Sequence, residues 1–91
     1  MKINDLSREV AQDTGVSIAI SEQVIKSALE IIKNTVAAGE DVKLHMFGNF
    51  ERAERAERNG RNPTTGEDLV IPACFAPRFR ASKDFKNAVN S

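Results

Sequence analysis

The 91-residue chain has no tryptophan and no tyrosine, and it has only one cysteine and one histidine. Cys74 therefore cannot form a disulfide within the chain, and His45 has no second histidine or cysteine that could help it bind a metal ion. The sequence also lacks the patterns of a nucleophilic triad or a phosphate-binding loop, so we expect no catalysis, no metal and no cofactor. Because so short a chain buries a limited core, partner chains are the expected source of additional stability.

Long apolar runs and a surplus of either charge are missing as well. No apolar run approaches the roughly 18 residues of a membrane helix, and the N-terminus shows no signal segment, so we expect a soluble, cytoplasmic protein with no membrane partner. The 13 basic residues balance 13 acidic ones, which argues against a uniformly basic nucleic-acid coat. The charge is nevertheless zoned, with a net −2 over residues 1–50, −1 over 51–74 and +3 over 75–91.

Apolar residues at helical spacing predict two helices in the first part of the chain, at residues 3–14 and 18–38. Asn4 or Asp5 is expected to cap the first helix, Gly15 to end it, and Ser17 to cap the second. The apolar stripe of the second helix is wider than a 12-residue helix could cover, so we expect burial against a second subunit. This stripe comprises Ile20, Val24, Ile25, Ala28, Leu29, Ile31, Ile32 and Val36.

From Asp41 the apolar period changes to two, which predicts a strand, and the segment 47–50 is expected to contain a turn. A second strand is predicted over 51–58. None of its residues larger than alanine is apolar, so it should project into solvent as one side of an arm.

A loop rich in glycine, asparagine and proline follows at residues 59–66, and Leu69 to Ile71 form the predicted returning strand. Pro72 and Pro77 should break that strand or place it at an edge, because proline donates no ladder hydrogen bond. Residues 78–81 are a predicted third strand. Ser82 is the expected N-cap of a last helix at 83–89.

Arginines recur every three residues along the arm, at Arg52, Arg55, Arg58 and Arg61. In a regular strand the first and third of them face one way and the other two face the opposite way. Arginine suits DNA because its flat guanidinium fits a narrow, negative minor groove and binds phosphate through two donors. The alternative is a solvated ribbon in which Glu51, Glu54 and Glu57 pair with these arginines.

Pro63 lies in the loop at the far end of the arm, beside Arg61 and Asn62. An apolar wedge in such a place can enter between base pairs, although an ordinary turn proline explains the same residue. A second basic cluster lies near the C-terminus, where it could flank the same DNA or simply form a basic helix end. It comprises Arg78, Arg80, Lys83 and Lys86.

The phenylalanines are interpreted as core and dimer-packing residues. Together with aliphatic residues of the second helix and the first strand they form the predicted dimer core. This core comprises Leu29, Ile32, Val36, Leu44, Phe47, Phe50, Phe79 and Phe85. Cys74 and Phe75 fall near the base of the arm, and we assign them no specific role.

These residues, read in order, resemble the HU/IHF family of bacterial histone-like proteins. The resemblance lies in Phe47-Gly48-Asn49-Phe50, Arg55, Arg58, Gly60-Arg61-Asn62-Pro63, Thr65-Gly66 and Ala88-Val89-Asn90, and it is colinear over the whole chain. It implies an α+β fold: an intertwined dimer with a helical base and a small antiparallel sheet extended into two β-ribbon arms. The single domain, 1–91, would comprise a helical dimerisation region (1–39), a sheet (40–81) with its arm at about 51–74, and a C-terminal helix (82–91).

The resemblance also implies a function, that of a nucleoid-associated, architectural protein that bends double-stranded DNA with little sequence preference. The proline wedge is a property of the family and comes to Pro63 only through the resemblance. Arg55, Arg58, Arg61 and Asn62 would line the minor groove, and Arg80, Lys83 and Lys86 would contact flanking phosphates. HU-like rather than IHF-like behaviour is favoured, as a homodimer or as a heterodimer with a related subunit.

The chain departs from the family pattern in its charge and in one turn. Met46 and Ser82 stand where glycine is usual, and Ile3 and Ile18 stand where many relatives have lysine. Fewer cationic contacts predict weaker binding over a shorter footprint, because DNA affinity scales with the phosphates neutralised. The balanced charge also supports a second hypothesis, in which the chain forms mixed dimers that modulate a more basic relative.

Overall fold

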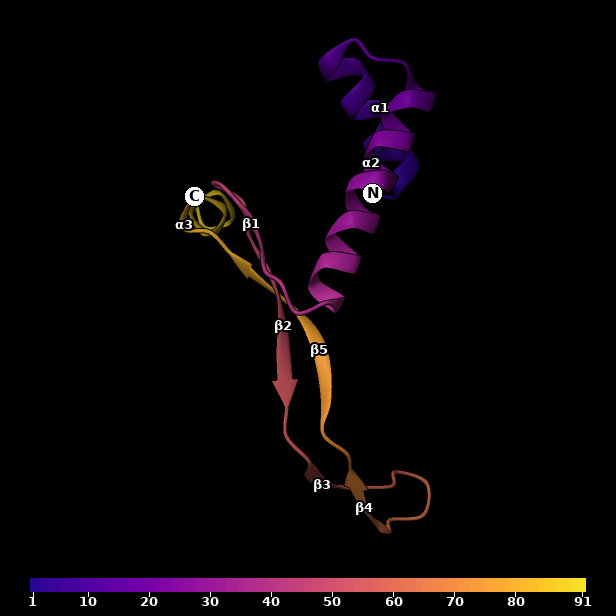
Figure 1. Cartoon of the computed structure of the whole chain (residues 1–91), viewed down its shortest axis with the longest axis vertical. Coiled ribbons are helices and arrows are strands. Elements are labelled where there is room, and N and C mark those ends of the chain that lie inside the picture. Colours follow the sequence, from indigo (N-terminus) through magenta and orange to yellow (C-terminus); the bar gives the residue numbers. More distant parts are fainter. The chain divides into compact units, whose positions relative to one another are not determined.

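The computed structural model describes all 91 residues, Met1–Ser91, as two compact units, Met1–Asn34 and Thr35–Ser91. The elements, labelled in Figure 1, are α1 (Ile3–Thr14), α2 (Ile18–Ala37), β1 (Val42–Leu44), β2 (Gly48–Arg55), β3 (Arg58–Arg61), β4 (Asp68–Ile71), β5 (Cys74–Ala81) and α3 (Lys83–Val89). The α+β class expected from the sequence is confirmed.

The bounds of α1 and α2 follow from local capping signals. Gly15 ends α1 in the left-handed conformation, with φ 77°, and Ser17 Oγ accepts a hydrogen bond from the Ile20 N–H at 3.2 Å. The predicted N-cap of α1, Asn4 or Asp5, was wrong by two or three residues. Lys2 occupies the N-cap position, and Asp5 contributes from the first turn, where its Oδ2 accepts the Lys2 N–H at 2.9 Å.

Most of the apolar surface of α2 is uncovered in the single chain. Val24 is 60% exposed, Leu29 53% and Ile31 62%, whereas the fully buried side chains of the two helices are the small ones of Ser7 and Ser21. Neither helix is long and apolar enough to cross a membrane. The stripe on α2 therefore remains available to a partner chain, as its width in the sequence predicted.

The sheet of the second unit has the antiparallel order β1-β2-β5 and two unlike faces. Val42 pairs with Phe50 and Phe50 with Phe79, which places these three residues on one face. The neighbouring row contains Lys43, Asn49 and Arg80 and lies on the other face. We call this second side, with Lys43, Asn49, Glu51, Arg78 and Arg80, the polar face.

The turn between β1 and β2 occupies residues 45–47, slightly earlier than the predicted segment 47–50. Met46 adopts a left-handed conformation with φ 61°, which costs a residue other than glycine about 1–2 kcal/mol. Gly48 is required for space, because a Cβ there would come within 2.6 Å of the Phe79 ring and 2.7 Å of the Arg80 carbonyl oxygen. Methionine thus occupies a left-handed position in this turn at a cost in backbone strain.

Four phenylalanines pack together between the sheet and α3. The ring centroid of Phe47 lies 5.4 Å from that of Phe79 and 5.2 Å from that of Phe85, and the centroids of Phe50 and Phe79 are 4.9 Å apart. Ser82 caps α3 as predicted, accepting the Phe85 N–H on its Oγ at 3.2 Å. Phe47 and Phe79 remain 45% and 40% exposed, so the cluster has an open side.

Two strand predictions were wrong. The predicted strand 51–58 is divided, since β2 ends at Arg55 and β3 begins at Arg58. The predicted third strand, 78–81, is the second half of the longer β5, which includes Pro77 opposite Arg52. Proline is tolerated there because β5 is an edge strand of the three-stranded sheet and its missing N–H faces no partner strand.

Candidate nucleic-acid interface

The arm, residues 51–74, is a two-stranded ribbon that continues β2 and β5 into β3 and β4 (Figure 1). Arg55 pairs with Cys74 on the sheet side of an interruption, and Arg58 pairs with Ile71 on its tip side. Two residues on each strand, 56–57 and 72–73, lie between these pairs, so the ribbon is interrupted on both strands at one level. Pro72 falls in this interruption, where its lack of an N–H costs no ladder bond.

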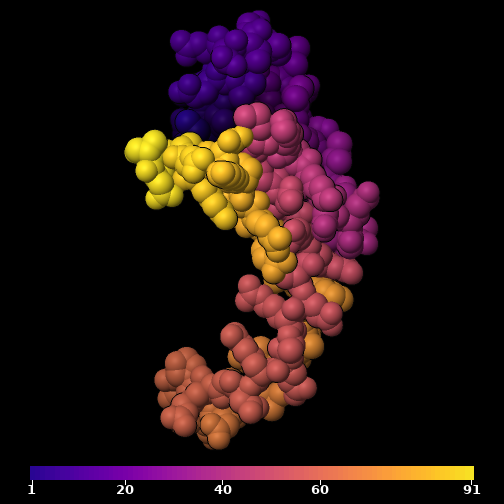
Figure 2. All heavy atoms as spheres, turned by 90° about the vertical axis from the view of Figure 1, so that its left-hand side faces the viewer, coloured from indigo at the N-terminus to yellow at the C-terminus, as the bar shows by residue number.

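The ribbon exposes nearly all of its side chains. Figure 2 shows it, in salmon and orange, as a narrow projection from the sheet. Arg55 and Arg58 are exposed, and neither forms an ion pair within the chain. Arg61 lies 3.8 Å from Asp68, measured from Nε to Oδ1, with both side chains largely in solvent, which makes for a weak pair. The arm thus carries cations that are available to an anionic ligand.

Arg52 is separated from the other arm arginines. It lies on the face of β2 opposite Glu51 and Arg55, donates from Nη1 to the Ala37 carbonyl oxygen at 3.3 Å, and places its guanidinium 4.1 Å from the centre of the Phe75 ring. A cation is favourable at the C-terminal end of α2, where the carbonyls carry partial negative charge. These contacts give Arg52 a structural role within the chain, and a DNA contact of this residue stays a prediction.

The tip loop, residues 62–67, is closed by its own hydrogen bonds. The Asn62 N–H donates to the Glu67 carbonyl and the Gly66 N–H to the Asn62 carbonyl, both at 2.8 Å. The Asn62 side chain also accepts the Thr64 N–H on Oδ1 at 2.9 Å, and Gly66 supplies the positive φ of 73°. The loop is shorter than the predicted 59–66, because β3 continues to Arg61.

This bonding leaves Pro63 exposed at the far end of the arm, on a loop whose backbone is fixed on both sides. Sequence reasoning considered Asn62 only as a groove contact. The structure adds that its side-chain carbonyl holds the turn that presents Pro63. The Asn-Pro-Thr order was a usable signal, because asparagine side chains commonly accept backbone N–H groups two residues ahead.

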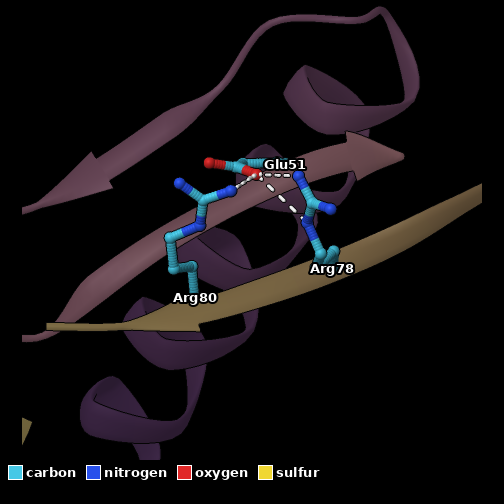
Figure 3. Close-up of polar contacts among 3 residues, drawn as sticks. All are labelled: Glu51, Arg78 and Arg80. Atoms are coloured by element: carbon cyan, nitrogen blue, oxygen red, sulfur yellow. Dashed lines mark hydrogen bonds and ion pairs between the residues drawn. The ribbon is translucent and has the colours of Figure 1, made fainter. Parts of the chain in front are cut away.

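Arg78 and Arg80 lie on the polar face and share one carboxylate (Figure 3). Glu51 Oε2 accepts hydrogen bonds from Arg78 Nη2 at 2.7 Å and Nε at 3.2 Å, and Arg80 Nη2 lies 3.6 Å away. The hydrogen bond from Arg78 lowers the pKa of Glu51, with smaller contributions from the charges of Arg80 and Lys43. The alternative considered from the sequence, in which arm glutamates pair with arm arginines, does not hold for Glu51, which pairs with arginines of β5.

The remaining cations predicted for the flank lie on α3, where Lys83 and Lys86 are exposed and form no ion pair. A groove of about 390 Å³ lies between the turn after β1 and the end of β5, and its lining includes Lys43, His45 and Arg80. Sequence reasoning gave Lys43 and His45 no part in the site. The alternation of β1 was the signal, since it places Lys43 on the same face as Asn49 and Arg80.

Comparison with known proteins gives consistent matches over the whole chain. The chain is 42% identical over 89 residues to the DNA-binding protein HU-1 of Halalkalibacterium halodurans, covering 98% of this chain and 99% of the relative. It is 46% identical over 85 residues to the DNA-binding protein HU of Lactococcus lactis, covering 93% of each. An HU–DNA cocrystal structure from Anabaena is 40% identical, with a TM-score of 0.95 over 98% of this chain and 97% of that one.

The model of the family described as bacterial DNA-binding protein matches residues 1–90. With these relatives, the match shows that the chain belongs to the bacterial DNA-binding protein family.

Proposed function

We propose that this chain is an architectural DNA-binding protein that enters the minor groove of duplex DNA and bends it by inserting Pro63 between base pairs. Binding is largely independent of sequence and serves DNA compaction in the nucleoid. The observation that carries the proposal is the arm itself, a ribbon with unpaired, exposed Arg55 and Arg58 that ends in a hydrogen-bonded loop presenting Pro63.

The width and the positive charges of the ribbon both suit a groove of DNA. A two-stranded ribbon is narrow enough to lie along a groove, and arginine is attracted by the strong negative potential of a narrow minor groove. A rigid apolar ring at the end of the ribbon can then open a base step at a cost of roughly a few kcal/mol, which is offset by contacts that the bent DNA makes with the flanks. The polar face and α3 provide Arg80, Lys83 and Lys86 for those contacts.

The functional unit is a dimer. In the single chain the apolar stripe of α2 and the open side of the phenylalanine cluster are both exposed, and Val36 is the only apolar side chain that is buried. Exposed apolar surface on this scale is typical of a chain that completes its core with a partner. A second copy of the chain or a related subunit would each supply such a partner.

Electrophoretic mobility shift at low salt tests the proposal with linear and nicked duplexes of the same sequence. We expect retardation of both, with tighter binding of the nicked duplex, because a nick removes part of the cost of bending. No retardation of either DNA by the isolated protein at micromolar concentration would favour the second hypothesis, a subunit that modulates a more basic relative through mixed dimers. That hypothesis draws on the balanced charge of the chain.

A further inference from the structure

Glu51 is the one carboxylate of the arm and sheet that contacts two arginines. Its side chain is only 15% exposed, whereas those of Arg78 and Arg80 are 53% and 60% exposed. The two guanidinium groups flank the carboxylate, one on each side (Figure 3). An anion that approaches the polar face therefore meets two guanidinium groups whose charge this carboxylate already partly neutralises.

The two arginines are engaged to different degrees. Arg78 directs both Nε and Nη2 toward Glu51 Oε2, at 3.2 and 2.7 Å, and these two donors form an edge of the guanidinium that can also grip a phosphate. Arg80 makes one longer contact of 3.6 Å through Nη2. Arg78 therefore has to release Glu51 before this edge can bind a phosphate, whereas Arg80 needs a smaller change.

The neighbouring Glu54 provides a contrast on the same strand. It lies on the opposite face of β2, opposite Phe75 in the register, and it forms no ion pair. Its negative charge adds to the overall charge of the arm but neutralises no particular arginine. The effect of Glu51 should therefore be specific to its position and distinct from the effect of one acidic residue more or less.

We propose that Glu51 competes with DNA phosphates for Arg78 and Arg80, and thereby sets how much the polar face contributes to DNA binding. The inference rests on the proposed function. A free arginine gains a phosphate contact and releases a counterion from the DNA. A paired arginine exchanges one anion for another, and it leaves the Glu51 carboxylate uncovered next to the DNA. Both consequences reduce the binding free energy that each arginine–phosphate contact adds.

The test is the DNA affinity of the full chain across a salt series for the wild type, Glu51→Gln and Glu54→Gln. Both substitutions remove one negative charge from the same strand and keep the size of the side chain. We expect Glu51→Gln to steepen the log–log salt slope by about 0.9 for each arginine released, so by roughly 1 to 2, and to raise affinity at low salt several-fold to tenfold. Glu54→Gln should change the slope by less than about 0.45, which is half the value expected for one phosphate contact.

A third variant, Glu51→Gln with Arg78→Gln and Arg80→Gln, tests whether the gain in slope and affinity depends on the two arginines. It should lose the added slope and affinity, and thermal denaturation checks that each variant folds. Three outcomes would each overturn the inference and leave the proposed function standing, provided that the wild type binds DNA. The salt slope of Glu51→Gln could equal that of the wild type, Glu51→Gln and Glu54→Gln could gain the same affinity and slope, or Glu51→Gln could bind more weakly than the wild type. Absence of DNA binding by every protein at low salt would contradict both.

Discussion

The arm and the polar face both present arginines, but they present them in different electrostatic states. Arg55 and Arg58 project from a narrow ribbon without an ion-pair partner, whereas Arg78 and Arg80 share the carboxylate of Glu51. A cation without an internal partner loses little when it binds a phosphate, and a paired one gives up an existing contact. We therefore expect each arm arginine to contribute more free energy to DNA binding than each arginine of the polar face.

The turns of the two regions differ in backbone strain. The tip loop places a glycine, Gly66, at its positive φ, and the turn between β1 and β2 places Met46 at its own. The tip is therefore a relaxed and internally bonded structure, and the turn beside the polar face is strained. The strain at Met46 lowers the stability of the sheet, whereas Gly66 adds no such cost at the tip.

The largest expected effect comes from removing charge from each region in equal amounts. Arg55→Ala with Arg58→Ala should weaken DNA binding at least about 30-fold, because each arginine contact contributes roughly 1–3 kcal/mol. Arg78→Ala with Arg80→Ala removes the same charge and should weaken binding less than about tenfold. Fluorescence anisotropy with one labelled duplex compares the two variants. Equal losses would remove the distinction between arm and polar face.

The next effect separates bending from binding at the tip. Pro63→Ala should reduce DNA bending strongly and lower affinity only several-fold, because the arm arginines and the flank contacts remain while the wedge is lost. Energy transfer between dyes at the two ends of a duplex measures the bend at saturating protein. Thr64→Ala is a control within the same loop that keeps Pro63. Wild-type bending by Pro63→Ala would contradict the wedge assignment.

Met46→Gly tests the strain of the turn beside the polar face. The substitution should raise the free energy of unfolding by about 1 kcal/mol, or the thermal midpoint by about 4–8 °C, because glycine adopts a positive φ without steric cost. Met46→Ala shortens the side chain but keeps the strain, so it should give no such gain. Thermal denaturation at one fixed protein concentration is needed because the chain is expected to be a dimer.

The smallest effect is the pH dependence that follows from Glu51. Its pKa in the folded chain is lowered by Arg78, so its pairing stabilises the fold above the ordinary pKa of glutamate, and the contribution is lost as the pH falls through the lowered value. Thermal midpoints of the wild type and Glu51→Gln should therefore converge as the pH is taken from 7 toward 3. A constant difference over that range would show that the ion pair does not stabilise the fold.

Local signals predicted the helices well. The predicted ranges 3–14 and 83–89 are those of α1 and α3, and α2 ends one residue before the predicted 38. These bounds were predictable because Gly15, Ser17 and Ser82 act on backbone groups close to them in the chain. The strands were less predictable. Whether Pro77 interrupts a strand depends on which strand lies beside β5, and the residue opposite Pro77, Arg52 of β2, lies 25 residues earlier in the sequence.

The candidate site shows the same division. The positions of Arg55, Arg58 and Pro63 on an exposed arm follow from a polar strand and a loop, and both can be recognised locally. The partners of Arg52 and Glu51 could not be predicted from spacing. Arg52 contacts Ala37 and Phe75, and Glu51 contacts Arg78, which is 27 residues away. Such pairs depend on strand register and on the face each residue occupies, and a one-residue change of register would separate them.

DNA bending by the wild-type protein tests the central claim most directly. A short duplex labelled at both ends, intact or with a central nick, would be titrated with protein while energy transfer reports the distance between the ends and anisotropy reports binding. We predict that energy transfer rises with occupancy for both duplexes and that the nicked duplex saturates at lower protein concentration. Saturated binding with no change in energy transfer would contradict the account.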